Sequence, residues 1–161
     1  MYMKTAIVYF SLDGNTEYVA KKIAQNLTGD LIKLVPAKQY PTGKVSKFFW
    51  GGKSVTFKDQ PQLQPYDFNV DEYDVIILGT PIWAGTYTPP FRTFLKENDL
   101  SGKKLAFFAC CSGGSADKCF KKLQAATSNG ELITTLRLVD PLTKFAPTND
   151  IKIKDFCNKL R

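Results

Sequence analysis

The chain has 161 residues, of which 43% are hydrophobic and 13% aromatic, so residues 1–161 make about one domain with a substantial core. It contains no histidine, which excludes Ser-His-Asp and Cys-His catalysis and histidine-ligated zinc, so we expect a bound cofactor to carry any chemistry. The net charge is +7, and because the excess lysines of the second half are typical of a solvated surface, nucleic-acid binding is only weakly indicated.

Residues 5–27 are predicted to form a buried strand, a short turn and a helix. Residues 6–10 are an unbroken apolar run, as expected for a parallel strand covered on both faces. Apolar side chains then recur with helical spacing up to Leu27, and Gly29 is a typical end signal. The turn between them consists of Ser11, Leu12, Asp13, Gly14, Asn15 and Thr16.

Two interpretations of this turn are open from the residues alone. Its hydroxyls, amide and glycine can gather backbone N–H groups at a helix N-terminus, which favours an anion such as phosphate. Alternatively, Asp13 or Ser11 caps the first helix amides and Gly14 takes a positive φ. The turn lacks the P-loop lysine and the glycines of GxGxxG, so a single phosphomonoester suits it better than a triphosphate or dinucleotide.

The next segment is the least regular. Residues 31–35 are predicted to form a short strand ended by Pro36, and glycines and prolines then interrupt the chain up to about residue 73. A short helix is expected around residues 45–50. Lysines alternate there with aromatic residues, a pattern that either contacts a base or a partner, or anchors a long connection onto the core, which we favour.

Alternating strands and helices fill the rest of the chain. Residues 75–79, 105–110 and 132–139 are predicted strands. One helix is predicted to begin after a Thr88 cap with two prolines and to end at about residue 97. Another is predicted over residues 116–126. Thr148 or Asn149 is predicted to cap a final helix.

This alternation predicts an α/β fold with a doubly wound five-stranded parallel sheet, flavodoxin-like, in the strand order 2-1-3-4-5. The ligand crevice of such a sheet lies where the strand order reverses. Three turns would meet there, formed by residues 11–16, 80–87 and 111–115. A flat heterocycle with a phosphate tail would suit all three turns.

The chain resembles short-chain proteins of the flavodoxin family, which bind FMN. The resemblance rests on the SxxGNT turn at residues 11–16, GTPIWAG at 79–85 and SGG at 112–114, and it covers essentially the whole length. It implies that Trp83 packs against the flavin ring. It further implies a phosphate site of Ser11, Asp13, Gly14, Asn15 and Thr16, one ring wall of Pro81, Ile82, Trp83, Ala84 and Gly85, and a second wall of Ser112, Gly113 and Gly114.

The implied function is that of an FMN-dependent redox protein, either an electron carrier or a small oxidoreductase. Its partner would be a redox protein or a small-molecule electron acceptor, and a homodimer is left open. The alternative is a non-enzymatic module that binds flavin or nucleic acid. Receiver-domain acids and the Cys-x5-Arg pattern of low-molecular-weight phosphatases are both missing.

Charge and cysteine content give two more expectations. Residues 75–96 contain no acid, so we expect a less negative second reduction potential than in acidic flavodoxins. Cys110, Cys111, Cys119 and Cys157 form no CxxC pair and are expected to be reduced in the cytoplasm. The longest apolar runs are too short for a membrane segment.

Overall fold

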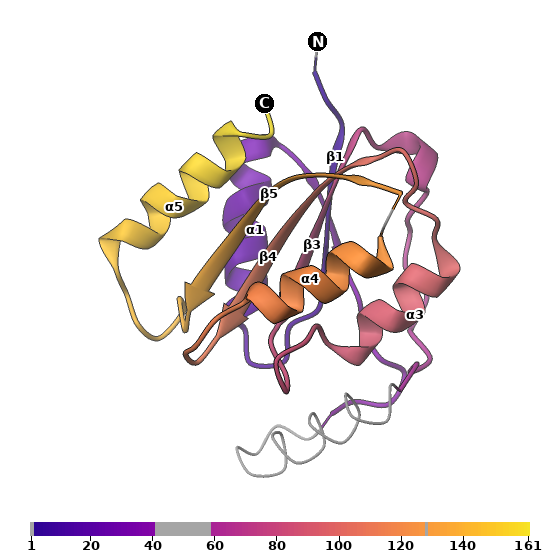
Figure 1. Cartoon of the computed structure of the whole chain (residues 1–161), viewed down its shortest axis with the longest axis horizontal. Coiled ribbons are helices and arrows are strands. Elements are labelled where there is room, and N and C mark those ends of the chain that lie inside the picture. Colours follow the sequence, from indigo (N-terminus) through magenta and orange to yellow (C-terminus); the bar gives the residue numbers. More distant parts are fainter. Residues whose placement is uncertain (1, 41–58, 128) are drawn as a thin grey trace.

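The computed structural model describes residues 2–40, 59–127 and 129–161. Its centre is a five-stranded parallel sheet (Figure 1). The strands are β1 (Thr5–Tyr9), β2 (Asp30–Lys33), β3 (Val75–Pro81), β4 (Lys104–Cys111) and β5 (Glu131–Val139). Their order is β2-β1-β3-β4-β5, which confirms the predicted flavodoxin-like α/β fold.

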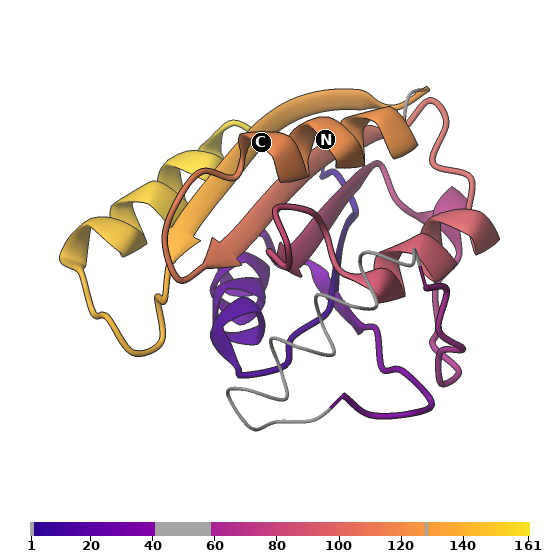
Figure 2. The same ribbon diagram turned by 60° about the horizontal axis from the view of Figure 1, so that its bottom comes forward.

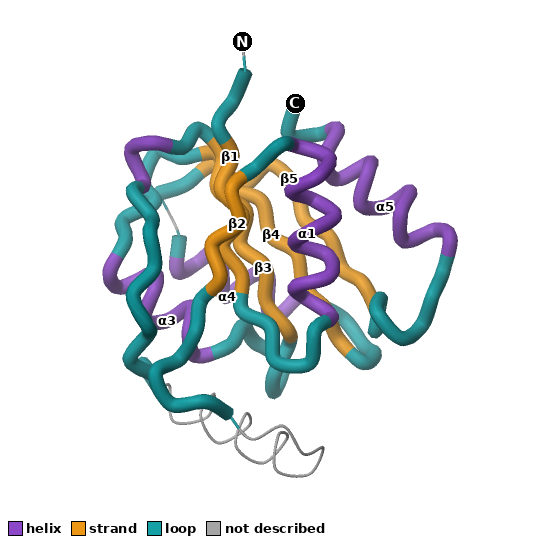
Figure 3. Tube along the Cα trace, turned by 180° about the vertical axis from the view of Figure 1, so that it is seen from behind, coloured by secondary structure: helices purple, strands orange, loops and turns teal. Residues whose placement is uncertain are grey.

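Helices cover both faces of the sheet. The helices α1 (Asn15–Leu27) and α5 (Pro147–Asn158) lie side by side on one face, which Figure 3 turns toward the viewer. The opposite face carries α3 (Pro89–Glu97) and α4 (Asp117–Ala126), and a 3₁₀ turn, η1 (Val70–Glu72), precedes β3. Successive strand residues contribute to opposite cores, as Ile76 packs toward α3 and Ile77 toward α1. Apolar strands without alternation are therefore required here.

Three details of strand bounds and helix caps differ from prediction. The second strand is Asp30–Lys33, earlier than predicted, and ends before Pro36. Thr88 precedes α3 as expected, but its hydroxyl makes no capping bond and pairs with Thr80 instead. The cap of α5 was wrongly predicted: the helix begins at Pro147 after Ala146, because proline's fixed φ suits the first helical position.

The described parts of the connection between β2 and β3 pair with each other and pack against the hydrophobic core. Pro36 and Leu63 form an antiparallel bridge, in which the Ala37 amide donates to the Gln62 carbonyl at 2.7 Å. Phe68 stacks on Tyr73, with ring centroids 5.6 Å apart. The predicted helix at 45–50 and the alternating lysines and aromatics lie outside the described residues.

A close approach between neighbouring strands occurs at Gly79. This residue is the register partner of Phe108 on β4. A Cβ atom at position 79 would overlap the Phe108 ring, so the ring takes the place of the missing side chain. Glycine is therefore required here for space.

Two absences hold for the described part of the chain. No helix there is long and apolar enough to cross a membrane. No cluster of histidine, cysteine, aspartate and glutamate side chains within the described ranges is arranged to hold a metal ion.

Candidate functional site

The turn between β1 and α1 holds two buried hydroxyl groups that have no hydrogen-bond partner among the residues that the structure describes. These are Oγ of Ser11 and Oγ1 of Thr16. Gly14 precedes the helix with φ at +98°, a conformation that favours glycine. Amides of the first helical turn have no acceptors inside a helix. Hydroxyl and amide donors thus meet at the positive end of the α1 dipole, where an anion is favoured.

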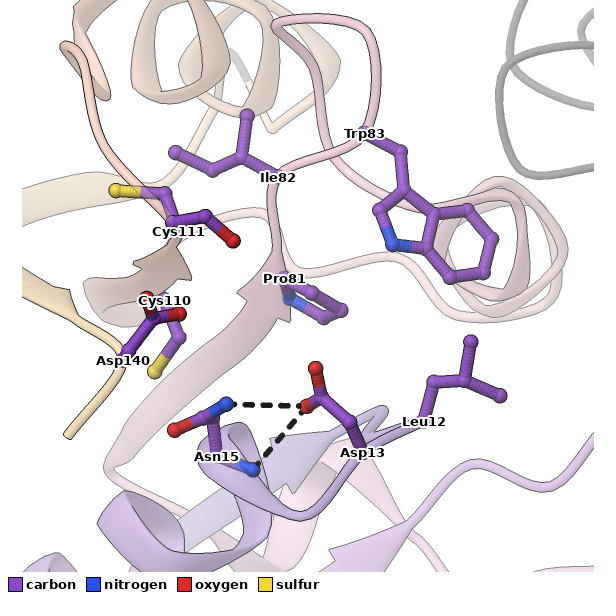
Figure 4. A pocket seen from close by; sticks show the side chains of 10 residues that line it. Leu12, Asp13, Asn15, Pro81, Ile82, Trp83, Cys110, Cys111 and Asp140 are labelled. Carbon is purple, nitrogen blue, oxygen red and sulfur yellow. Dashed lines mark hydrogen bonds between the residues drawn. The ribbon is translucent and has the colours of Figure 1, made fainter. Parts of the chain in front are cut away.

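Asn15 connects this turn to a segment far along the chain. The backbone nitrogen of Asn15 and its side-chain Nδ2 both donate to Oδ1 of Asp13 at 3.3 Å (Figure 4). Asp13 therefore does bond the first backbone amide of the helix. The Oδ1 of Asn15 accepts the backbone amide of Leu142 at 2.9 Å. A Cβ at Gly14 would lie 3.1 Å from Cδ2 of Leu142. The connection between β5 and α5 therefore rests directly on the first turn.

The turn after β3 is fixed at its base and at its tip. At the base, the buried Oγ1 of Thr80 donates to the Pro81 carbonyl at 2.8 Å and accepts the Thr88 amide at 3.1 Å. The two threonine hydroxyls are also bonded to each other at 3.0 Å. At the tip, the Trp83 and Thr86 backbones exchange two hydrogen bonds of 3.0 Å. Ala84 and Gly85 between them have φ of +49° and +73°, the pattern of a type I′ turn.

Trp83 faces the site from within an aromatic cluster. Only 8% of it is exposed, and its ring meets Phe10 and Tyr40 edge to face at centroid distances of 5.6 and 5.2 Å. It nevertheless lines the pocket described next. Its packing against a flavin stays a prediction, and its support by two other rings is a feature that the sequence did not indicate.

The three turns meet in one pocket at the carboxyl ends of β1, β3 and β4, the sheet edge that Figure 2 brings forward. Figure 4 shows the carboxylate of Asp13 pointing into the space below Pro81, with Trp83 on one side and Cys111 on the other. The lining residues are Leu12, Asp13, Asn15, Pro81, Ile82, Trp83, Cys110, Cys111, Ser112 and Asp140. The predicted convergence of three turns is thus observed.

Comparison with known proteins identifies the family. The sequence model of the family described as Flavodoxin matches residues 4–150. The chain belongs to the flavodoxin family.

Solved structures share its fold. A flavoprotein from Bacteroides uniformis is 25% identical, with a TM-score of 0.81 over 98% of this chain and 99% of that one. A flavoprotein from Lactobacillus acidophilus, solved in complex with FMN, is 22% identical, with a TM-score of 0.74 over 87% and 95%. The two-electron reduced flavodoxin of Megasphaera elsdenii is 21% identical, with a TM-score of 0.60 over 96% and 99%.

In this flavodoxin-family chain, two carboxylates line the pocket. Asp13 was expected, whereas Asp140 follows β5 and was missed. The Asp140 carboxylate pairs with Nζ of Lys144 at 3.1 Å, which offsets its charge. The expected reduction potential was based on the lack of acids in residues 75–96 and did not take Asp140 into account. The carboxyl ends of all parallel strands lie at one edge of the sheet. Applied to the end of β5, this argument would also have placed Asp140 beside the pocket.

The remaining predicted residues of this family member lie around the pocket rather than in its lining. Gly113 and Gly114 have positive φ beyond the Ser112 wall, and Gly85 lies beneath the Lys118 side chain. The residues that do not line the pocket are Ser11, Gly14, Thr16, Ala84, Gly85, Gly113 and Gly114. Leu12 and Cys111 belong to turns that were predicted to meet at the crevice, although neither was among the predicted site residues, and Cys110 was missed.

The Cys110 thiol at the pocket floor is not a nucleophile at neutral pH. Burial raises its pKa to about 12, so it stays protonated. Cys111 is half-buried; its Sγ accepts from Nη1 of Arg137 and donates to the Leu138 carbonyl, both at 3.9 Å. At the pocket, both thiols serve as wall groups.

Proposed function

We propose that this member of the flavodoxin family binds one FMN at the meeting point of the three turns and takes part in electron transfer, as a carrier or a small oxidoreductase. The observation that supports this proposal is the pair of buried hydroxyls of Ser11 and Thr16, for which the described residues supply no geometrically good hydrogen-bond partner. A buried polar group without a partner is costly, and a phosphate would supply acceptors for both.

Each of the three turns would bind a different part of FMN. The 11–16 turn and the N-terminus of α1 would bind the phosphate. The 80–88 turn, fixed by Thr80, would hold one side of the ring, and Ser112 to Gly114 the other. When bound, FMN supplies the one- and two-electron chemistry that the side chains lack. The chain's own part is to bind, to orient and to exclude water.

The test compares FMN with riboflavin, which lacks the phosphate. FMN is expected to bind at 1:1 and more tightly than riboflavin, measured by quenching of flavin fluorescence. Thr16→Val should weaken FMN binding about five- to tenfold for one lost hydrogen bond, and leave riboflavin binding unchanged. Equal affinity for the two flavins would overturn the phosphate assignment.

Stability provides a second readout. Because Thr16 Oγ1 has no geometrically good hydrogen-bond partner among the described residues, Thr16→Val should leave the stability of the FMN-free protein unchanged or slightly raised. A matched control is Thr127→Val, whose buried hydroxyl donates to the Leu123 carbonyl at 2.8 Å. That change should destabilise the protein and leave FMN affinity alone.

The proposed electron-transfer role implies a partner, either a redox protein or a small-molecule acceptor. The four unpaired cysteines support a reducing, cytoplasmic setting. Turnover of a nicotinamide donor with a quinone by the FMN-loaded protein alone would indicate an oxidoreductase. Reduction only through a second redox protein would indicate a carrier.

A further inference from the structure

The connection between β5 and α5 forms an exposed surface with both apolar and basic groups. Phe145 is 78% exposed and Leu142 is 48% exposed, so two large apolar side chains are available on the same connection. Beside them runs a groove of about 390 Å³. Its lining residues are Arg137, Val139, Lys144, Phe145, Ala146, Thr148, Asn149 and Lys152, and together with Leu142 they define the β5–α5 surface.

The charge of this surface is positive. Arg137, Lys144 and Lys152 line the groove, and no acid is among the described residues that line it. Asp140 at its border neutralises Lys144. Asp150 on the same helix is paired with Lys22 of α1 at 2.7 Å. Lys152 forms no ion pair with any residue that the structure describes, and its charge remains available to a partner.

The β5–α5 surface adjoins the candidate cofactor pocket through three contacts. Asp140, which lines that pocket, pairs with Lys144. Arg137 donates to Sγ of Cys111 in the pocket wall. The Leu142 amide donates to Asn15 in the proposed phosphate turn. A protein seated on this surface would therefore lie next to the cofactor.

We propose that the β5–α5 surface is the docking site of an acidic electron-transfer protein, with Phe145 as the apolar anchor and Lys152 and Arg137 as the charges that orient it. This inference rests on the proposed function. Charge complementarity selects this occupant, because a second copy in two-fold contact would set the same cations against each other. A protein that exchanges electrons with the cofactor must also dock close to the pocket. Binding to a membrane does not require a surface in that position.

The experiment uses the FMN-loaded full chain and a reduced [2Fe–2S] ferredoxin of net negative charge, which gives one electron per cluster. The rate constant of flavin reduction is followed by stopped-flow absorbance at several salt concentrations. Lys152→Glu is compared with Lys121→Glu, an exposed lysine of α4 on the other face. Phe145→Ser is compared with Tyr2→Ser, which removes a 67% exposed ring from the other end of the sheet.

Lys152→Glu and Phe145→Ser should each lower the rate constant about five- to tenfold at low salt, and both controls should stay within about twofold. The Lys152→Glu deficit should vanish as salt rises, because the screening length falls from about 30 Å at 0.01 M to about 3 Å at 1 M. The Phe145→Ser deficit should persist. Photoreduction with a small deazaflavin donor should be equal in all variants.

Three outcomes would overturn the docking proposal. The first is equal rates for Lys152→Glu and Lys121→Glu at low salt. The second is binding to anionic phosphatidylserine vesicles that both surface variants abolish while ferredoxin rates stay unchanged, which would assign the surface to a membrane. The third is a dimer that Phe145→Ser dissociates without changing the rate.

FMN titration of every variant separates this proposal from the proposed function. If the wild-type chain binds no FMN, the proposed function fails. Docking is then judged by titrating oxidised ferredoxin against the FMN-free chain. Salt-sensitive binding that Lys152→Glu loses would still support the β5–α5 surface as a docking site.

Discussion

Replacing Thr80 by valine should destabilise the protein more than most single substitutions. Thr80 is fully buried, and its hydroxyl takes part in three hydrogen bonds, to the Pro81 carbonyl, the Thr88 amide and the Thr88 hydroxyl. Valine has nearly the same shape, so little packing is lost. At about 1 kcal/mol per net hydrogen bond, Thr80→Val should cost about 3 kcal/mol.

The assay is urea and thermal unfolding followed by circular dichroism. For a chain of this size, 3 kcal/mol corresponds to a fall in Tm of about 6 to 12 °C. Thr80→Ser makes the opposite change, since it keeps the hydroxyl and loses the methyl group, and it should cost less than Thr80→Val. Thr88→Val removes only one of the three bonds and should cost about 1 kcal/mol.

The same substitution should loosen the turn that is proposed to hold the ring. FMN affinity should fall with stability in Thr80→Val and much less in Thr88→Val. If Thr80→Val is no less stable than Thr80→Ser, the hydroxyl does not fix the base of the turn and the reasoning fails.

Other predictions concern charge, thiols and pH. Asp13→Asn keeps an acceptor for the Asn15 amide and removes a like charge, so FMN affinity should rise by about 1 kcal/mol, or about fivefold; weaker binding would contradict this. Iodoacetamide at pH 8 should label native protein once, at Cys111, as mass spectrometry can show, because burial raises the pKa of the Cys110 and Cys119 thiols to about 12 and of Cys157 to about 11. These thiols have higher pKa values in the folded protein than in the unfolded chain. Their contribution to the free energy of unfolding is therefore complete below pH 9 and is lost between about pH 9 and 12. Unchanged urea midpoints from pH 8 to 11 would be inconsistent with it.

The sheet was predictable because its strands are governed by local sequence. The apolar runs that became β1, β3 and β4 have no alternation, and only a parallel sheet covered on both faces accommodates them. Once the strands are parallel, their carboxyl ends share one edge. The convergence of the first three turns followed from that, and so did most of the residues that line the pocket.

The missed features depend on contacts between distant parts of the chain. The bond between Leu142 and Asn15 spans 127 residues, and nothing near either residue signals it. Trp83 was placed at the crevice by its neighbours in sequence, but its packing on Tyr40 depends on how the connection after β2 returns. The N-cap of α5 was missed because Thr148 and Asn149 are better capping residues than Ala146, whereas the adjacent proline set the start of the helix.

The overlap of Phe108 with the space above Gly79 constrains how this sheet can evolve. Neither position can change size alone, because alanine at 79 would displace the ring and a smaller residue at 108 would leave a void over bare backbone. Relatives with a side chain at the position of Gly79 should therefore carry a smaller residue opposite it. The side-chain volumes at positions 79 and 108 should therefore covary among relatives. A protein that carries only one of the two substitutions should fold poorly.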